Sequence, residues 1–583
     1  MESLADLRKS IGFSQLAFSE LLGVSVASLR RWERGDSRPS ALAAEKIHLV
    51  KKEIEAGHLD ELLAKSIQHR SDNIADVPEY AFSSGGEPHR AVLMPYVYNG
   101  PRDQIAFYHQ LISMQESAAA SADWKTYRSR LSIVQSIDGI PTAQYLLERP
   151  KANGKSWSAD AGAHGWHRYV GRFPAQLIRA IINFFGLTEQ DLLLDPFCGS
   201  GTTTVEARLL GIPAIGIEIS PLSAMISRTK SCFPQNTAVL RKHISMLNSF
   251  YSDRRQEFLG GRCISDYSYD DIIRRGGNSI SAFTNYEKWF TKEALLGTSI
   301  IVEYIQHLND APFVKEAIAT ALSAKMRSIG NVDVDVVRAE YRKSPRENVD
   351  VLKLVTHQML KMIKSIDLML SSHAETILGE QSVKIIEGDC LSAELEAGSI
   401  SAIITSPPYG VESLSYLRTH LLSFRALEPV LGIDPYNFDG NVIGSEYLED
   451  VRTPTTQFEV MRVSGTCRIF FESLLRNPEP EPSEKRILMM IKFFEDMYRL
   501  IKKFDYWLKD HGKVAFIIGN KRLGAHMIPT DRIMIELFEY CGFRHTSYIA
   551  HKLKTNNSNS KVPWQDRIID NEYILFFEKG NRT

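Results

Sequence analysis

A glycine-rich turn and a later acidic residue have the spacing of a cofactor site. The turn Asp195–Thr203 follows a short apolar strand and precedes a helix-patterned segment. In such a turn the glycines let a ligand approach the backbone, while amides at the helix start face an anion. Glu218 ends the next expected strand roughly 20 residues later, where a carboxylate can hold ribose hydroxyls. A glycine-rich turn alone is often only a tight connection, but the acid at this place favours a cofactor site.

A second segment, Ser406–Tyr409, could supply hydrogen-bond acceptors and a stacking surface. It reads Ser-Pro-Pro-Tyr and follows the apolar strand Ser401–Thr405. Prolines carry no backbone donor, so carbonyl oxygens here point outward beside the Ser406 hydroxyl. The Tyr409 ring offers a flat face for a planar partner. The alternative is a proline-rich turn without function, which the preceding cofactor motif makes the weaker interpretation.

Together with Asp389 in a Glu-Gly-Asp-Cys stretch, these motifs resemble the amino-group DNA methyltransferases over about His164–Ser223 and Val383–Lys579. The resemblance implies S-adenosylmethionine as cofactor, with Asp389 bonding the adenine amino group. The stretch His167–Leu177 resembles the family's methionine-side motif, although Arg172 stands where the family often has lysine. The cofactor residues that the resemblance assigns are Phe173, Pro174, Asp195, Phe197, Gly199, Ser200, Gly201, Thr202, Thr203, Glu218, Ile219, Asp389 and Cys390.

The resemblance also assigns catalysis to Ser406, Pro407, Pro408 and Tyr409. An exocyclic amine is a poor nucleophile because its lone pair is delocalised into the ring, so the site must accept its protons. Ser406 and the Pro407 carbonyl can do so, while Tyr409 stacks on a base turned out of the duplex. Serine at the first position resembles the cytosine-N4 branch, and an adenine-N6 enzyme remains the main alternative. This chemistry requires no metal.

Composition and cysteine spacing limit which other classes of protein and binding site the chain can have. The chain has 583 residues, a hydrophobic fraction of 44% and a net charge of -1, so DNA binding must come from local clusters of cations. Six scattered cysteines without C-x-x-C spacing argue against zinc and disulfides, and Cys198 is better explained by packing than by nucleophilic chemistry. The amino terminus lacks a signal peptide and no apolar run could cross a membrane, which favours a cytoplasmic protein.

The pattern around these motifs predicts an α/β fold, a Rossmann-like doubly wound sheet with a helical insertion, plus a small all-α domain at the amino terminus. We expect a helix-turn-helix domain at 1–60, a linker and elaboration at 61–158, and the first part of the methyltransferase domain at 159–230. The helical insertion then covers 231–380, and the second part of the methyltransferase domain covers 381–583. The expected strands are Asp191–Asp195, Ala214–Glu218, Val383–Glu387, Ser401–Thr405, Lys513–Ile518 and Glu572–Phe577, and the expected helices include Gln104–Ser117, Ala175–Phe185, Tyr286–Leu308 and Val351–Leu370.

The first 56 residues resemble the Cro/repressor-type helix-turn-helix family. Ser14–Gly23 predicts the first helix of the motif, and Ser25 can cap a second helix that runs through Trp32. Repressor-type helices enter the major groove through their first residues, while nearby cations hold phosphates. Ser25, Ser28 and Arg30 are therefore candidates for base contact, and Arg31 and Arg34 for backbone contact. The alternative is that these arginines are solvated or contact the methyltransferase body.

Three regions could read the methylation site: the insertion, Val411–Pro482, and the polar stretch Lys552–Arg567, which mixes cations with amides. The expected partners are duplex DNA and a cognate restriction endonuclease, with no membrane. We expect the amino-terminal domain to bind an operator independently of the methylation site. A rival of another class is a transcription regulator whose methyltransferase-like part only senses the cofactor.

Overall fold

The computed structural model describes only part of the amino-terminal third of the chain. It covers residues 4–10, 15–22, 24, 26–39, 43–44, 47–48 and 50–52, then short strands within 80–156. From 162 to 552 it is described apart from 170, 173–174, 276–284, 309–310, 334–339, 341, 343–345, 373–376, 378, 380–381, 412–415, 433–441, 446–457, 477–481 and 525, and it is described again at 571–580.

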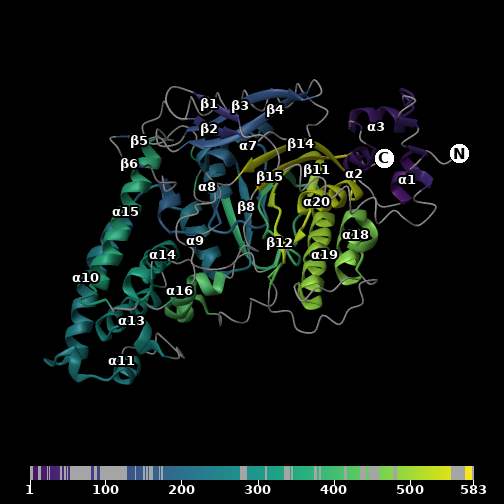
Figure 1. The fold of residues 1–583 in the computed structure, drawn as a ribbon. Coiled ribbons are helices and arrows are strands. Elements are labelled where there is room, and N and C mark those ends of the chain that lie inside the picture. The colour runs from purple at the N-terminus through teal and green to yellow at the C-terminus, as the bar shows by residue number, and fades with distance from the viewer. Residues whose placement is uncertain are drawn as a thin grey trace.

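A seven-stranded sheet forms the centre of the molecule (Figure 1). Its spatial order is β14-β15-β11-β10-β7-β8-β9. The five strands from β11 to β9 are parallel, while β15 runs antiparallel to both of its neighbours. The strands are β7 (Leu193–Asp195), β8 (Ala214–Glu218), β9 (Val383–Glu387), β10 (Ile400–Thr405), β11 (Leu508–Gly519), β14 (Phe543–Lys552) and β15 (Asn571–Lys579).

The order confirms the expected doubly wound sheet. From β7 the chain continues to β8 on one side, and β10 later pairs with β7 on the other side. This reversal is a topological switch point, where ligands of open α/β sheets bind beyond the carboxyl ends of the strands. Both chemical motifs of the sequence follow these two strands.

Alternating residues of the central strands face two helical layers, because successive side chains in a strand point to opposite faces. Ile403 packs in a core with helices on one face, α18 (Gly465–Arg476), α19 (Glu484–Trp507) and α20 (Thr530–Tyr540). Ala402 and Ile404 pack in a second core with α7 (Ala175–Phe185) and α8 (Thr202–Leu209). The sheet is therefore buried on both faces.

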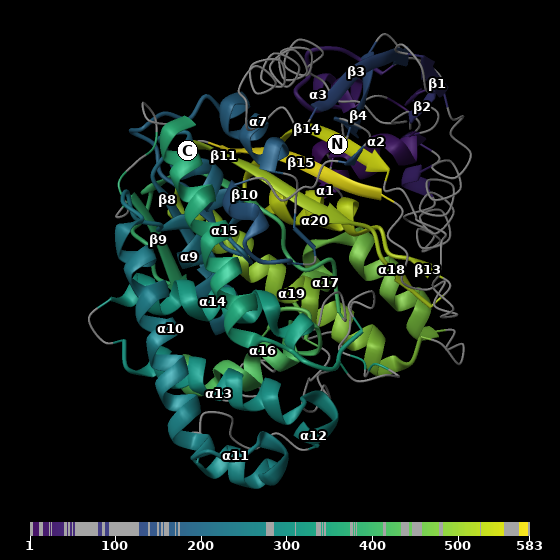
Figure 2. The same ribbon diagram turned by 90° about the vertical axis from the view of Figure 1, so that its left-hand side faces the viewer.

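The expected helical insertion lies between β8 and β9 and has a core of its own. Buried residues of this core include Leu295, Ile318 and Ile363. The helices extend to one side of the sheet (Figure 2). They are α9 (Pro221–Ser231), α10 (Ala238–Leu259), α11 (Tyr269–Arg275), α12 (Tyr286–Trp289), α13 (Lys292–Gln306), α14 (Pro312–Ile329) and α15 (Val351–Ser372), and α16 (Tyr416–Leu431) packs against them from further along the chain.

The amino-terminal unit contains α1 (Leu4–Ser10), α2 (Gln15–Leu22) and α3 (Val26–Glu33). Phe18, Leu22 and Leu29 form its buried core, and half-buried Trp32 packs against them. Ile469 of α18 joins the same cluster, so the unit packs directly on a helix that covers the central sheet.

The structure differs from the sequence analysis at a few places, and one expected helix lies outside the described residues. The helix expected at Tyr286–Leu308 is broken because Thr291 has an extended backbone and its hydroxyl caps α13 through the Ala294 amide. The strand β14 was not predicted, because its polar residues hide any apolar alternation. The stretch 61–158 contains the paired strands β1 (Tyr80–Ser83) with β2 (Pro88–Ala91), β3 (Arg128–Ile137) with β4 (Ile140–Glu148), and β5 (Lys151–Ala152) with β6 (Lys155–Ser156). The helix expected at Gln104–Ser117 lies outside the described residues.

None of the helices that the structure describes is both long enough and apolar enough to span a membrane.

Candidate functional site

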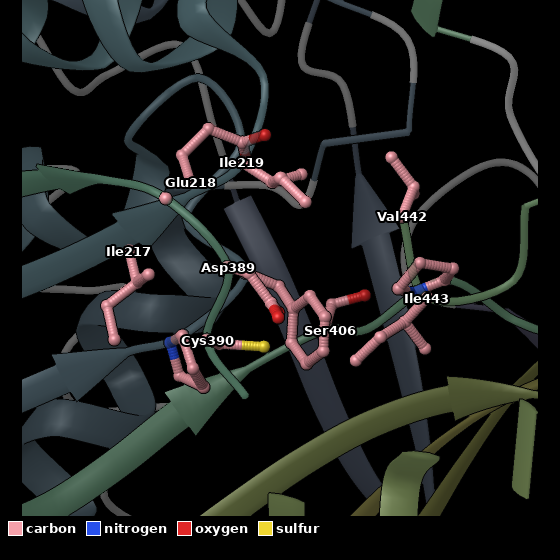
Figure 3. Close-up of a pocket in the computed structure, with 12 residues that line it drawn as sticks. Ile217, Glu218, Ile219, Asp389, Cys390, Ser406, Val442 and Ile443 are labelled. Carbon is pink, nitrogen blue, oxygen red and sulfur yellow. The ribbon is translucent and has the colours of Figure 1, made fainter. Parts of the chain in front are cut away.

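A pocket opens at the switch point, beyond the carboxyl ends of β7, β8, β9 and β10. The space between its walls, together with the open solvent at its mouth, is about 440 Å³. The cofactor motifs and the Ser-Pro-Pro-Tyr segment meet in its wall (Figure 3). The lining residues are Pro196, Phe197, Ile217, Glu218, Ile219, Gly388, Asp389, Cys390, Ser406, Pro408, Val442 and Ile443.

Glu218 connects the second strand to the glycine-rich turn. Its carboxylate accepts the Gly199 N–H at 2.9 Å and the Ser220 N–H at 2.9 Å. Burial raises the pKa of Glu218 to about 7, against the lowering effect of these backbone bonds. The acid is therefore held in place by two amides and lies in the pocket wall, where hydroxyl donors of a ligand can reach it.

The turn itself needs glycine. Gly201 has φ +83, and a Cβ there would stand 2.6 Å from the Ser227 hydroxyl oxygen. Gly199 has φ +51, and a Cβ there would stand 3.5 Å from the Tyr169 ring. The left-handed backbone favours glycine at both positions, and at Gly201 the close Ser227 hydroxyl also leaves no room for a side chain.

Asp389 forms the other acidic wall of the pocket. Its carboxylate accepts the Leu391 N–H at 2.9 Å and the Ser392 hydroxyl at 3.2 Å. Figure 3 shows it between Cys390 and Ser406. The resemblance to methyltransferases assigned this acid to the cofactor, and the pocket brings it to the same cavity as Glu218.

Asp195, also assigned to the cofactor, lies behind the wall. It accepts the Thr405 hydroxyl at 2.6 Å and the Phe197 N–H at 3.1 Å. Burial raises the pKa of Asp195 to about 6. Its bond to Thr405 ties the cofactor turn to the last residue before Ser406, which fixes the two motifs relative to each other.

The catalytic segment is held by residues from distant parts of the chain. The Tyr409 hydroxyl donates to Glu572 at 3.0 Å, and burial beside that acid raises the pKa of Tyr409 well above its usual range. Just after the segment, the Lys521 ammonium donates to the Val411 carbonyl. Sequence analysis identified neither Glu572 nor Lys521, because no local pattern links them to Ser406–Tyr409.

Val442 and Ile443 were also missed as pocket residues. They close the pocket on the side of Ser406 (Figure 3). Gly444, the next residue, has φ +81, and a Cβ there would stand 2.8 Å from the Gly410 carbonyl oxygen. This close approach of two backbones brings the wall to the catalytic segment, and a lone glycine in an irregular stretch was its only sequence signal.

In the motif resembling the methionine-side stretch, Tyr169 makes the informative contacts. Its hydroxyl and that of Ser223 are 2.9 Å apart, and its ring stacks on His420 with centroids 5.6 Å apart. With its contact to Gly199, Tyr169 joins this stretch to the glycine-rich turn and to α16. Phe173 and Pro174, which were expected to pack on the cofactor, lie outside the described residues.

Histidines and thiols near the site have structural roles. His164 bonds Glu206 at 2.8 Å and His167 bonds Ser323 at 2.8 Å, and burial lowers the pKa of both imidazoles. Burial raises the pKa of Cys198 and Cys390, so neither thiol provides a thiolate. Among the described residues, no group of histidines, cysteines and acids could hold a metal ion.

The predicted residues therefore divide into two sets. Phe197, Glu218, Ile219, Asp389, Cys390, Ser406 and Pro408 line the pocket. The others, which support the wall without lining it, are Asp195, Gly199, Ser200, Gly201, Thr202, Thr203, Pro407 and Tyr409.

The DNA-contact candidates of α3 have different surroundings. Arg31 is exposed, and exposed Arg34 pairs with Asp36 at 2.8 Å. Arg30 instead donates to the Gln15 side chain at 2.7 Å and to the His545 carbonyl at 3.5 Å. Ser28 is half-buried. Ser25 and most of the Lys552–Arg567 stretch, 553–567, lie outside the described residues.

Two family models match the chain. The model described as DNA methylase, of the N6/N4 type, matches residues 82–227, and the model described as helix-turn-helix matches residues 4–49. The first match begins within 61–158 and includes the glycine-rich turn and Glu218. The second covers α1, α2 and α3.

Relatives with known names extend this similarity over most of the chain. The type II methyltransferase M.BsoBI of Geobacillus stearothermophilus is 24% identical over 71% of this chain and 85% of its own length. The type II methyltransferase M.MvaI of Kocuria varians is 24% identical over 68% of this chain and 86% of its own length. The type II methyltransferase M.MjaII of Methanocaldococcus jannaschii is 42% identical over 33% of this chain and 31% of its own length. These matches identify an N6/N4-type DNA methylase region at residues 82–227 and an amino-terminal helix-turn-helix region at residues 4–49 of this chain.

Proposed function

We propose that this protein transfers a methyl group from S-adenosylmethionine to the N4 amino group of cytosine in specific sites of duplex DNA. The observation that carries the proposal is the pocket at the switch point. Two acids suited to a cofactor, Glu218 and Asp389, share it with Ser406 of the catalytic segment.

The pocket residues fit S-adenosylmethionine. An adenosyl group needs apolar walls for its base and carboxylates for its hydroxyl and amino donors. Phe197, Ile217 and Ile219 supply apolar wall, and Glu218 and Asp389 supply the acceptors. When bound, the cofactor contributes an electrophilic methyl group on a positively charged sulfur.

The chain's own residues would hold the target amine. The Ser406 hydroxyl and the Pro407 carbonyl accept hydrogen bonds from the two N–H groups of the amine, which directs the nitrogen lone pair toward the methyl donor. The nitrogen gives up one proton to solvent once it has been methylated. Tyr409 holds the ring of the extruded base by stacking. In this structure the Tyr409 hydroxyl is fixed by Glu572, which limits rotation of the ring. The main contribution of the site is positioning of the amine in a partly dehydrated pocket.

Nucleoside analysis is the direct test. Duplex DNA is incubated with the full chain and S-adenosylmethionine carrying an isotope-labelled methyl group, and the digested nucleosides are separated by mass spectrometry. Labelled N4-methyl-2′-deoxycytidine is the expected product. Labelled N6-methyl-2′-deoxyadenosine would replace the cytosine proposal by the adenine alternative, and cofactor binding without any labelled nucleoside would favour a regulator that only senses the cofactor.

We further propose that the enzyme protects DNA from a cognate restriction endonuclease. Relatives that align with about two thirds of the chain are named type II methyltransferases, which supports this role. DNA methylated by the protein should resist cleavage by that endonuclease, whereas equal cleavage of methylated and unmethylated DNA would contradict the role.

A further inference from the structure

The helix-turn-helix unit is bound to one edge of the methyltransferase domain. The Gln15 N–H donates to the Glu539 carboxylate of α20 at 3.1 Å, and the Arg30 guanidinium donates to the His545 carbonyl of β14 at 3.5 Å. Ile469 of α18 adds an apolar contact. Figure 1 shows the purple helices next to α18 and α20.

These contacts use the side of the unit that a repressor presents to DNA. In a helix-turn-helix the first helix of the motif crosses the phosphate backbone, and the second contacts base edges through its amino-terminal part. Gln15 is the first residue of α2, and Arg30, a sequence candidate for base contact, lies in the last turn of α3. The first amide of α2 and one of the candidate DNA-contact side chains are therefore engaged by the protein itself.

A polar network makes this contact specific. Arg30 bonds the Gln15 side chain at 2.7 Å, Gln15 bonds Glu33 at 2.7 Å, and Arg8 pairs with Glu33 at 2.7 Å. The Arg8 and Glu33 side chains are only 12% and 6% exposed. The Gln15 side chain is thus fixed by the interior of the unit, while its backbone N–H points at the Glu539 carboxylate.

Glu539 resembles a DNA phosphate in its position and chemistry. Helix amino termini bind phosphates and carboxylates alike, because their amides are unpaired and the helix dipole favours negative charge. The carboxylate accepts the first amide of α2 and lies near Arg8 and Arg30. Burial of Glu539 raises its pKa to about 7, while the two arginines act in the opposite direction.

We propose that the edge formed by Glu539 and His545 competes with DNA for the helix-turn-helix unit, so that the unit binds duplex DNA only after it leaves the methyltransferase domain. Docking and operator binding are then mutually exclusive states of one chain. This inference rests on the proposed DNA binding of the unit, but not on which base the enzyme methylates. It adds a link between the two domains to the expectation that the unit binds an operator independently of the methylation site.

The first test measures affinity for DNA with and without the Glu539 charge. Full-length wild type, Glu539→Gln and Glu578→Gln are titrated with a labelled pool of random-sequence duplexes. Glu578 of β15 is the matched control. It pairs with Arg544, which lies in β14 beside His545, and among the described residues it does not touch the unit. We expect Glu539→Gln to bind about three- to tenfold more tightly, because the free form of the unit becomes more populated. The gain should disappear when the exposed Arg31 and Arg34 are also changed to alanine. Unchanged or weaker binding by a folded Glu539→Gln protein overturns the proposal.

The second test uses wild type and needs no substitution. Hydrogen exchange is followed in the full chain with increasing amounts of the same duplex pool. The proposal expects α3 to become protected while peptides containing Glu539 and His545 lose protection. Protection of α3 with unchanged exchange at Glu539 and His545 would mean that both contacts coexist, which rules the proposal out. If α3 becomes protected neither in wild type nor in Glu539→Gln, the unit does not bind duplex DNA, and the proposal is also rejected. Methylation of the pool, measured by nucleoside analysis, reports separately on the proposed enzyme function.

Discussion

The cofactor half and the catalytic half of the pocket are held in place in different ways. In the cofactor half, Asp389 accepts an amide two residues away, and Glu218 accepts amides 2 and 19 residues away. In the catalytic half, Tyr409 is held by Glu572, 163 residues later, and Val411 by Lys521, 110 residues later. Each acid of the first half is thus oriented by backbone near it in the sequence or in the glycine-rich turn, although the helical insertion separates Glu218 from Asp389, whereas the second half is held by side chains from distant parts of the chain.

This difference separates the expected effects of substitutions. Changes in the cofactor half should alter cofactor affinity, since its acids are proposed to bind the cofactor and are oriented by backbone amides. Changes in the catalytic half should alter turnover, since its residues are proposed to hold the target base and are oriented by Glu572 of β15 and by Lys521, which follows β11.

The largest effect is expected from Tyr409→Ala. Loss of base stacking, worth ~1–3 kcal/mol, should lower kcat/KM for methyl transfer by roughly 10- to 100-fold while cofactor affinity is largely retained. Radiolabelled methyl transfer and calorimetry with S-adenosylmethionine measure the two quantities. A thermal melt of the variant controls for loss of folding. Full turnover by the variant would remove the stacking role and weaken the division into two halves.

Glu218→Ala and Asp389→Ala should show the opposite pattern. Each removes charge-assisted hydrogen bonds worth ~1.5–3 kcal/mol, so cofactor affinity should fall by roughly 10- to 100-fold. Calorimetry with S-adenosylmethionine is the measurement. Wild-type affinity in either variant would take that acid out of the cofactor site.

The pH dependence of cofactor binding tests the role of Glu218 in the cofactor half. Burial raises the pKa of Glu218 to about 7, and ribose hydroxyls need the ionised carboxylate as acceptor. Affinity should therefore rise about tenfold from pH 6 to pH 8, as the ionised fraction rises through this pKa. The sign for folding is opposite: because the folded pKa lies above the ordinary 4.5, the contribution of Glu218 to stability is full below pH 4.5 and is lost as the pH rises to about 7. The Glu218→Gln variant should bind the cofactor weakly, and its affinity should change little with pH. If its affinity still rises with pH as in wild type, the titration belongs to another group.

The smallest effect is expected from Glu572→Gln, which weakens the bond to the Tyr409 hydroxyl. A neutral hydrogen bond replaces one to a charged acceptor, so turnover should fall about threefold to tenfold with KM for the cofactor unchanged. Tyr409→Phe removes the same bond from the other side. If Glu572 acts only through Tyr409, the double variant should be no slower than the slower single variant. Additive losses would show that Glu572 has a separate role.

Much of the sheet and of the cofactor half could be predicted from sequence. Strand β8 and helix α7 begin and end at the expected residues, because their apolar periodicity and their flanking polar or glycine residues are local signals. Glu218 and Asp389 could be named because each stands at a fixed place after a strand or in a short motif. The Cro-type pattern likewise identified α2 and α3.

Only the tertiary structure placed Glu572, Lys521, Val442 and Ile443 at the catalytic segment. It also turned Arg30 toward His545 and made β14 part of the sheet. These features depend on contacts between residues far apart in the sequence, such as Gly410 with Gly444 and Arg30 with His545, or on pairing with an already formed edge, and such contacts leave no periodicity in the chain. The sequence by itself determined which residues form the motifs that resemble those of a methyltransferase, because that information lies in residue type and short spacing. Which of them share the pocket, and which face of the helix-turn-helix unit is covered, was decided by packing across the whole molecule.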